Sequence, residues 1–182
     1  MEHLSPLGVV QMAKKSFVEN LKALLKLLLE FDIDFVLIGG FAGVVHGSTL
    51  VTRDLDICAA ITEEQVAKLR IALKDLHPRH RMNPNAKHSF LEYPKDIRGI
   101  NNIYLETDLG ILDILSQTQP AGSFMEIKGR SAEISLYGYK CRVISVEDLI
   151  LVKDAMKRPK DLQMAQELRL IQEKQGPGNS NR

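Results

Sequence analysis

Two aspartates separated by one residue give the first indication of chemistry in this sequence. Asp54 and Asp56 fall in a predicted strand, where residues two apart point to the same face, so their carboxylates are expected to project side by side. Like charges that close repel each other, and a hard divalent cation with oxygen ligands relieves the repulsion. The same spacing occurs elsewhere in the chain, so the neighbouring residues have to set this pair apart.

A glycine turn upstream supplies that context. The apolar run FVLI at 35–38 predicts a buried strand that stops at Gly39 and Gly40, and residues 41–46 predict a short helix closed by Gly47. A strand, a glycine turn and a helix N-terminus form a phosphate-sized concavity lined with backbone N–H groups. His46, at the end of that helix, is expected to be structural rather than catalytic.

Asp113 is the third acid of interest, because it interrupts the apolar strand GILDIL at 110–115. A carboxylate in such a strand is costly unless it is paired or bound to metal. One interpretation is a buried aspartate that accepts backbone N–H bonds. With the acid pair and the glycine turn upstream, we favour a third metal ligand. Three convergent carboxylates beside a phosphate cradle suggest two-metal phosphoryl or nucleotidyl transfer.

The elements that must position these acids follow from the spacing of apolar residues and from turn residues. They predict an α/β (α+β) fold with a mixed sheet flanked by helices and a small C-terminal helical unit. We expect an N-terminal helix unit at 1–32, a core at 33–144, C-terminal helices at 145–175 and a disordered tail at 176–182. Helices are predicted at 10–31, 63–76, 145–157 and 159–174, and further strands at 55–59, 89–93, 103–107, 110–115, 124–127 and 141–144.

The glycine turn, the segment TRDLD at 52–56 and Asp113 together resemble the polymerase-beta-type nucleotidyltransferase superfamily over about residues 33–165. The segment 37–57 most resembles small bacterial nucleotidyltransferases of toxin–antitoxin and abortive-infection systems. The resemblance implies a nucleotidyltransferase fold in which Gly39 and Gly40 bind triphosphate. It also implies that Asp54, Asp56 and Asp113 ligate two magnesium ions.

The sequence departs from that family at Gly40, where many members have a serine that touches phosphate. Ser48, Thr49 or Thr52 could supply the missing hydroxyl. Ser48 and Thr52 are therefore counted, with the two glycines, as candidate nucleotide-binding residues.

A second similarity to the same subgroup lies in the segment 145–161. The resemblance implies that a lysine, Lys153, faces the triphosphate and that an acid, Asp161, closes the motif, with Lys160 beside it. Lys153 and Lys157 are four residues apart and are expected to share a helix face. The alternative is a solvated helix with ordinary surface lysines, in which Asp161 only favours the helix N-terminus.

Composition narrows the function classes. The chain has 24 Lys and Arg against 23 Asp and Glu, a net charge of +1, so a global basic field for nucleic acid is absent. Basic stretches at 77–101 and 151–182 could form local patches or simply solvated faces. Two distant cysteines do not make a disulfide framework, and no signal peptide or apolar run of about 18 residues is present. We therefore expect a cytoplasmic protein without a membrane partner.

These observations predict a magnesium-dependent nucleotidyltransferase that moves a nucleoside monophosphate from a nucleoside triphosphate, ATP among the candidates, to an acceptor hydroxyl. The resemblance implies an RNA 3′ end, tRNA included, or a partner toxin or antitoxin protein as acceptor, in a toxin–antitoxin or defence system. Asp113 is expected to help activate the hydroxyl. Two alternatives stay open: a catalytically silent antitoxin or binding partner, and a two-metal hydrolase such as a nuclease.

Overall fold

The computed structural model of the chain describes residues 6–82 and 85–175. The predicted disordered tail at 176–182 lies outside the described residues. No helix among the described residues combines the length and the apolar character needed to cross a membrane.

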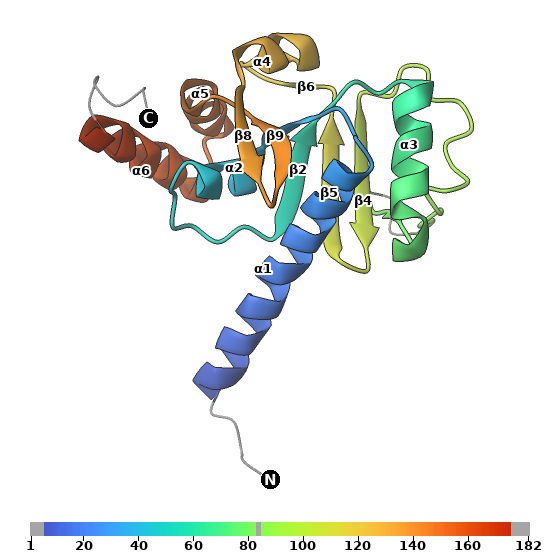
Figure 1. The fold of residues 1–182 in the computed structure, drawn as a ribbon, viewed down its shortest axis with the longest axis horizontal. Helices are drawn as coiled ribbons and strands as arrows, with labels where there is room; N and C mark the ends of the chain where they lie inside the picture. The colour runs from blue at the N-terminus through green and yellow to red at the C-terminus, as the bar shows by residue number, and fades with distance from the viewer. Residues whose placement is uncertain (1–5, 83–84, 176–182) are drawn as a thin grey trace.

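A seven-stranded mixed sheet forms the centre of the molecule, in the order β3-β4-β5-β2-β1-β9-β8 (Figure 1). β1 lies antiparallel to β2 and parallel to β9, while β2 lies parallel to β5. The other neighbouring pairs are antiparallel, and this mixture confirms the predicted fold class. The strands are β1 (Val36–Ile38), β2 (Asp54–Cys58), β3 (Arg79–His80), β4 (Asn102–Thr107), β5 (Gly110–Leu115), β8 (Ala132–Leu136) and β9 (Tyr139–Val143), with a separate hairpin of β6 (Gln117–Thr118) and β7 (Gly122–Ser123).

Helices pack around this sheet and include one pair formed by the C-terminal segment. α1 contacts β2, β5 and β9, whereas α2 contacts β1, β2 and α5. α5 and α6 pack against each other on the opposite side of the view from α3 (Figure 1). The helices are α1 (Pro6–Glu30), α2 (Gly39–Val45), α3 (Glu63–Leu73) with a 3₁₀ turn at Lys74–Leu76, α4 (Phe124–Arg130), α5 (Val146–Met156) and α6 (Pro159–Gln175).

The leucine stripe of α1 accounts for its place on the sheet. Leu21, Leu24, Leu25 and Leu28 recur at steps of three and four residues, and each is at most 1% exposed. Burial of each leucine contributes about 2 kcal/mol relative to an exposed side chain. The helix predicted from this spacing is therefore confirmed, although it begins before residue 10.

Two predicted strands are wrong. At 89–93 the chain makes a single bridge, Ser89 to Arg79, and then turns, because the amides of Glu92 and Tyr93 both donate to the Ser89 carbonyl. Residues 124–127 belong to helix α4, whose capping box joins Ser123 and Glu126. That Ser-x-x-Glu signature is a helix start, and it outweighs the apolar residues that follow it.

A hairpin between β8 and β9 extends the sheet beyond the strand predicted at 141–144. Tyr137 and Gly138 form its turn, both with positive φ, at 54° and 85°. Two consecutive positive φ values are typical of the tight turns that join antiparallel strands. The predicted helix starts at Ser145 and Thr62 are confirmed, since each hydroxyl accepts a backbone N–H three residues on.

Candidate active site

The turn from β1 into α2 brings backbone against the acid pair. Gly39 has φ of +65° and begins α2, and a Cβ atom at this position would overlap the carboxylate of Asp56. The next residue, Gly40, donates its backbone N–H to that carboxylate. Both the backbone angle and the close approach therefore require glycine at 39.

The three predicted acids converge. Asp54 and Asp56 lie on β2, and the parallel pairing of β2 with β5 places Asp113 directly beside Asp56. One carboxylate oxygen from each of the three aspartates lies within 4.8 Å of the others. The buried apolar residues on either side, Leu55 and Ile57 among them, fix the strand so that the acids share one face.

The electrostatics of this cluster are unfavourable without a cation. Burial, then the charges of Asp54 and Asp113, raise the pKa of Asp56 from 3.8 to about 7. Burial also raises the pKa of Asp113, against the opposing effect of a hydrogen-bonded arginine. Three clustered carboxylates form a donor set that suits a hard divalent metal ion. The cluster is therefore a candidate metal site.

That arginine is Arg81, and the sequence interpretation did not identify it. Its Nε donates to Asp113 Oδ1 over 3.1 Å, and its Nη2 donates to Oδ2 of the same carboxylate. The guanidinium also lies 5.4 Å from the ring centre of Tyr104, the residue opposite Asp113 on β4. Arg81 comes from the basic stretch at 77–101, and the pairing of β3 with β4 brings it here.

A cavity of about 190 Å³ opens on one side of the acid pair, and we call it the basic cavity. It is lined by Gly40, Thr52, Asp54, Asp56, Lys153, Arg158, Lys160, Asp161 and Met164. Helix α5 ends and helix α6 begins beside this cavity. These two helices and the link between them supply its cations, Lys153, Arg158 and Lys160. The C-terminal residues named by the resemblance thus lie beside the acids.

Asp161 organises the cations of the basic cavity. It is only 4% exposed and accepts from Lys153 Nζ over 2.8 Å and from Arg158 Nε over 2.5 Å. Burial opposes ionisation of Asp161, but the hydrogen bonds from the two cations outweigh it and hold its pKa below the usual value. Lys153 is buried, so the solvated-lysine interpretation fails for it but holds for Lys157, which is exposed and ends the helix.

Of the hydroxyls considered for phosphate, the structure places Thr52 at the cavity and Ser48 elsewhere. Thr52 Oγ1 donates to Asp54 Oδ1 over 2.9 Å. A Cβ atom at Gly40 would lie 2.5 Å from Thr52 Oγ1, so this threonine occupies the space that a side chain at position 40 would need. Ser48 instead donates to Glu167 of α6 over 2.6 Å, because the loop after α2 is tied to that helix.

His46 has the structural role expected of it. Its Nε2 donates to the backbone carbonyl of Ile144 over 2.7 Å, which joins the end of α2 to the segment after β9.

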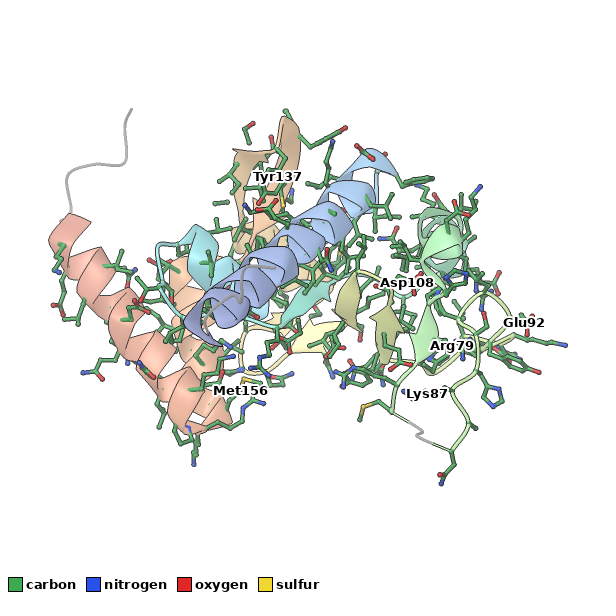
Figure 2. The ribbon with its side chains drawn as sticks, turned by 90° about the horizontal axis from the view of Figure 1, so that it is seen from below. Arg79, Lys87, Glu92, Asp108, Tyr137 and Met156 are labelled. Atoms are coloured by element: carbon green, nitrogen blue, oxygen red, sulfur yellow. The ribbon has the colours of Figure 1, made fainter. Side chains whose placement is uncertain are left out.

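A second cavity, of about 340 Å³, opens on the other side of the acids, and we call it the Asp113 cavity. Asp54, Asp56, Lys153 and Arg158 border both cavities. Met156 is 45% exposed and lines the Asp113 cavity, and it lies well apart from Lys87 and Arg79 (Figure 2). The rest of its lining is Ile38, Gly39, Arg81, Tyr104, Asp113, Leu115, Thr118, Ile144, Leu149 and Val152.

Solved structures with a similar fold are nucleotidyltransferases. The lincomycin-bound crystal structure of the lincosamide antibiotic adenylyltransferase LnuA matches with a TM-score of 0.59 and 19% identity, over 85% of this chain and 97% of that one. The solution structure of the antibiotic-resistance factor ANT(2'')-Ia matches with a TM-score of 0.52 and 17% identity, over 91% and 85%. The sequence itself matches no protein-family model and no curated protein. The chain therefore has the nucleotidyltransferase fold.

Proposed function

We propose that this protein is a magnesium-dependent nucleotidyltransferase that transfers a nucleoside monophosphate from a nucleoside triphosphate to an acceptor hydroxyl. The observation that carries the proposal is the convergence of Asp54, Asp56 and Asp113 within 4.8 Å, between a basic cavity and a second cavity. A two-metal hydrolase would need only the three acids. The glycine turn and the buried Lys153 beside the acids also suit a triphosphate, which favours a nucleotidyltransferase.

In this proposal the basic cavity takes the triphosphate. Lys153 and Arg158 supply positive charge, Thr52 supplies a hydroxyl donor, and Gly40 lets the backbone approach the phosphates closely. Gly39, the other predicted triphosphate residue, forms the turn that precedes Gly40 and lines the second cavity. Asp161 keeps both cations directed at the cavity because it holds each of them by a hydrogen bond.

The three aspartates would hold two magnesium ions. Their hard oxygen donors fit such ions. Burial, then the charges of Asp54 and Asp113, raise the pKa of Asp56, and a bound cation would favour its ionised form. Bound magnesium would assist ionisation of the attacking hydroxyl and stabilise the leaving pyrophosphate. Asp113, on the wall of the second cavity, would orient the acceptor hydroxyl toward the α-phosphate.

The resemblance of the sequence and the similar structures point to different acceptor classes. The resemblance of the sequence favours an RNA 3′ end or a partner protein in a toxin–antitoxin or defence system. The names of LnuA and ANT(2'')-Ia point instead to antibiotics as acceptors for this fold. The chemistry common to all of these is attack of a hydroxyl on the α-phosphate, with release of pyrophosphate.

The experiment is a transfer assay with magnesium, each nucleoside triphosphate and a cell extract that contains both tRNA and small metabolites. We expect magnesium-dependent pyrophosphate release by the wild type and a loss of at least about 100-fold for Asp54→Asn. Asp108→Asn, an exposed acid bound to His77 away from the site, is the matched control and should keep full activity.

Two outcomes would favour the alternatives. Folded protein that neither binds a magnesium–nucleotide complex nor releases pyrophosphate would favour the catalytically silent binding partner. Cleaved nucleic acid without pyrophosphate would favour a two-metal nuclease.

A further inference from the structure

Asp113 borders one of the two cavities at the acid cluster and not the other. Asp54 and Asp56 line both cavities, whereas Asp113 lines only the Asp113 cavity and Asp161 lines only the basic cavity. If Asp113 directs the acceptor hydroxyl, as the proposed function requires, the acceptor has to enter through the Asp113 cavity. In the proposed function the triphosphate occupies the basic cavity, whose volume is about 190 Å³.

Apolar side chains make up part of the lining of the Asp113 cavity. Leu149, Val152 and Met156 come from α5, and the buried Ile38 and Ile144 come from the end of β1 and the segment after β9. A volume of about 340 Å³ lies at the lower end of the range of roughly 300–1,000 Å³ typical of small-molecule sites. These apolar side chains gain binding energy from an apolar body. The cations of the same lining, Arg81, Lys153 and Arg158, are each held by an aspartate.

The basic segment near this cavity has few charges left for phosphate. Lys87 pairs with Glu106 at 2.8 Å, Arg98 pairs with Asp96 at 2.6 Å, and Arg81 pairs with Asp113. Lys87 also lies far from Met156, a lining residue of the cavity, in the view of Figure 2. Nucleic-acid affinity depends on cations that are free to neutralise phosphates, so this surface is poorly suited to a polynucleotide.

The cavity also lacks a platform for stacked bases. Among the described residues that line it, Tyr104 is the one aromatic side chain, and the guanidinium of Arg81 lies over the Tyr104 ring at 5.4 Å from its centre. Recognition of single-stranded nucleic acid uses aromatic faces that are open to bases.

We infer that the Asp113 cavity is the acceptor subsite and that it takes a compact, hydroxyl-bearing molecule with a largely apolar body rather than a polynucleotide. The inference rests on the proposed function. The hydroxyl oxygen would form its new bond to the α-phosphorus, the bond from that phosphorus to the bridging oxygen would break, pyrophosphate would leave, and the hydroxyl proton would pass to solvent. No other reactant is needed.

Methyl NMR separates the two cavities because each contains a methionine. Met164 lines the basic cavity and Met156 lines the Asp113 cavity. Magnesium with a non-hydrolysable α,β-methylene ATP should move the Met164 methyl signal. If it does not, the proposed nucleotide site is wrong. If it instead moves the methyl signals of Val152 and Met156, the Asp113 cavity holds the nucleoside and the inference about the acceptor is wrong.

The acceptor probes are phenyl and cyclohexyl glycosides, added to the nucleotide-loaded protein, with total tRNA in a parallel sample. We expect saturable shifts of the Val152 and Met156 methyl signals with the glycosides and none with tRNA. Shifts of these signals with tRNA, or the absence of shifts with every glycoside, would overturn the inference.

A pair of variants on α5 provides the control. Met156→Trp places a larger side chain in the lining of the Asp113 cavity and should narrow it. Met156 is 45% exposed, so the fold should tolerate the substitution. It should weaken glycoside binding about tenfold. Leu151→Trp, at a neighbouring position that is 53% exposed and outside the cavity lining, should leave it unchanged. Equal weakening by both variants would show that the probes bind elsewhere, which also overturns the inference.

Discussion

At the scale of single residues, Gly40 and Thr52 share one small space beside the acid pair. In the superfamily that the sequence resembles, many members have a serine at the position of Gly40. The side chain of Thr52 occupies the adjoining space, with its hydroxyl at the same cavity. Glycine at 40 and threonine at 52 therefore act as a pair, and a hydroxyl is kept beside Asp54.

This pairing predicts an outcome for a double-variant cycle. Gly40→Ser should destabilise the fold by about 1–3 kcal/mol, because the new Cβ atom collides with Thr52. Adding Thr52→Ala should recover most of that loss in urea unfolding. Gly129→Ser is the control, since nothing lies within 4 Å of a Cβ atom there. A double variant no more stable than Gly40→Ser alone would contradict the pairing.

Asp56 predicts how stability depends on pH in metal-free protein. Its pKa is 3.8 when unperturbed and about 7 in the fold, so between these values the folded state binds more protons than the unfolded state. The free energy of unfolding should therefore fall as pH rises from 4 to 8, by at most about 4 kcal/mol from this group. Unfolding of wild type and Asp56→Asn across this range measures the difference.

The slope should be shallower in the Asp56→Asn protein, and magnesium should restore stability to the wild type at pH 8. A wild-type profile that matches that of Asp56→Asn would show that Asp56 is ionised in the fold without cost.

The contact of Arg81 with Asp113 predicts that the guanidinium competes with a metal ion for this carboxylate. Its guanidinium holds both oxygens of Asp113, so a metal ion has to displace at least one of these hydrogen bonds. Arg81→Gln should tighten manganese binding by about three- to tenfold, because it removes a nearby positive charge. Titration followed by electron paramagnetic resonance measures the affinity. Arg98→Gln, an exposed arginine paired with Asp96, should leave it unchanged. Weaker binding by Arg81→Gln would mean that Arg81 instead orients Asp113 for the metal.

At the scale of elements, parallel pairing of β2 with β5 and the contact of α5 with α6 build the two halves of the site. The strands carry the acids, and the helices carry the buried pair of Lys153 and Asp161, with the exposed Arg158 in the short link between them. The strand acids could be predicted from the sequence because their spacing and apolar surroundings are local. Arg81 could not, since its contact with Asp113 spans 32 residues and depends on the pairing of two short strands.

The buried ion pair of Lys153 and Asp161 predicts a large loss of stability when Asp161 is removed. Asp161→Ala leaves the buried ammonium of Lys153 without its partner, which should lower the free energy of unfolding by about 3–5 kcal/mol. Asp154→Ala is the control, because it breaks a more exposed ion pair with Arg169 between the same two helices and should cost less than about 1 kcal/mol. Similar losses for both variants in urea unfolding would contradict this assignment.

At the scale of the whole molecule, the acid cluster lies where two cavities of different character meet. Residues of α2, α5 and α6 line the basic cavity, and residues of β4, β5 and the segment after β3 line the Asp113 cavity. Asp54 and Asp56 line both cavities. The fold class could be predicted from the order of helices and strands. The errors at 89–93 and 124–127 arose where turn and capping residues outweighed apolar patterns. The division into two cavities could not be predicted, because it depends on side chains from segments far apart in the chain.

The central claim is that the acids between these cavities direct transfer of a nucleoside monophosphate. The most direct measurement runs two parallel reactions that differ only in whether the α- or the γ-phosphate of the nucleoside triphosphate carries the label. The account predicts that α-label moves to the acceptor and γ-label leaves as pyrophosphate, and that both changes vanish in Asp54→Asn. Transfer of γ-label to the acceptor, or release of γ-label as free phosphate with no α-label on any acceptor, would contradict it.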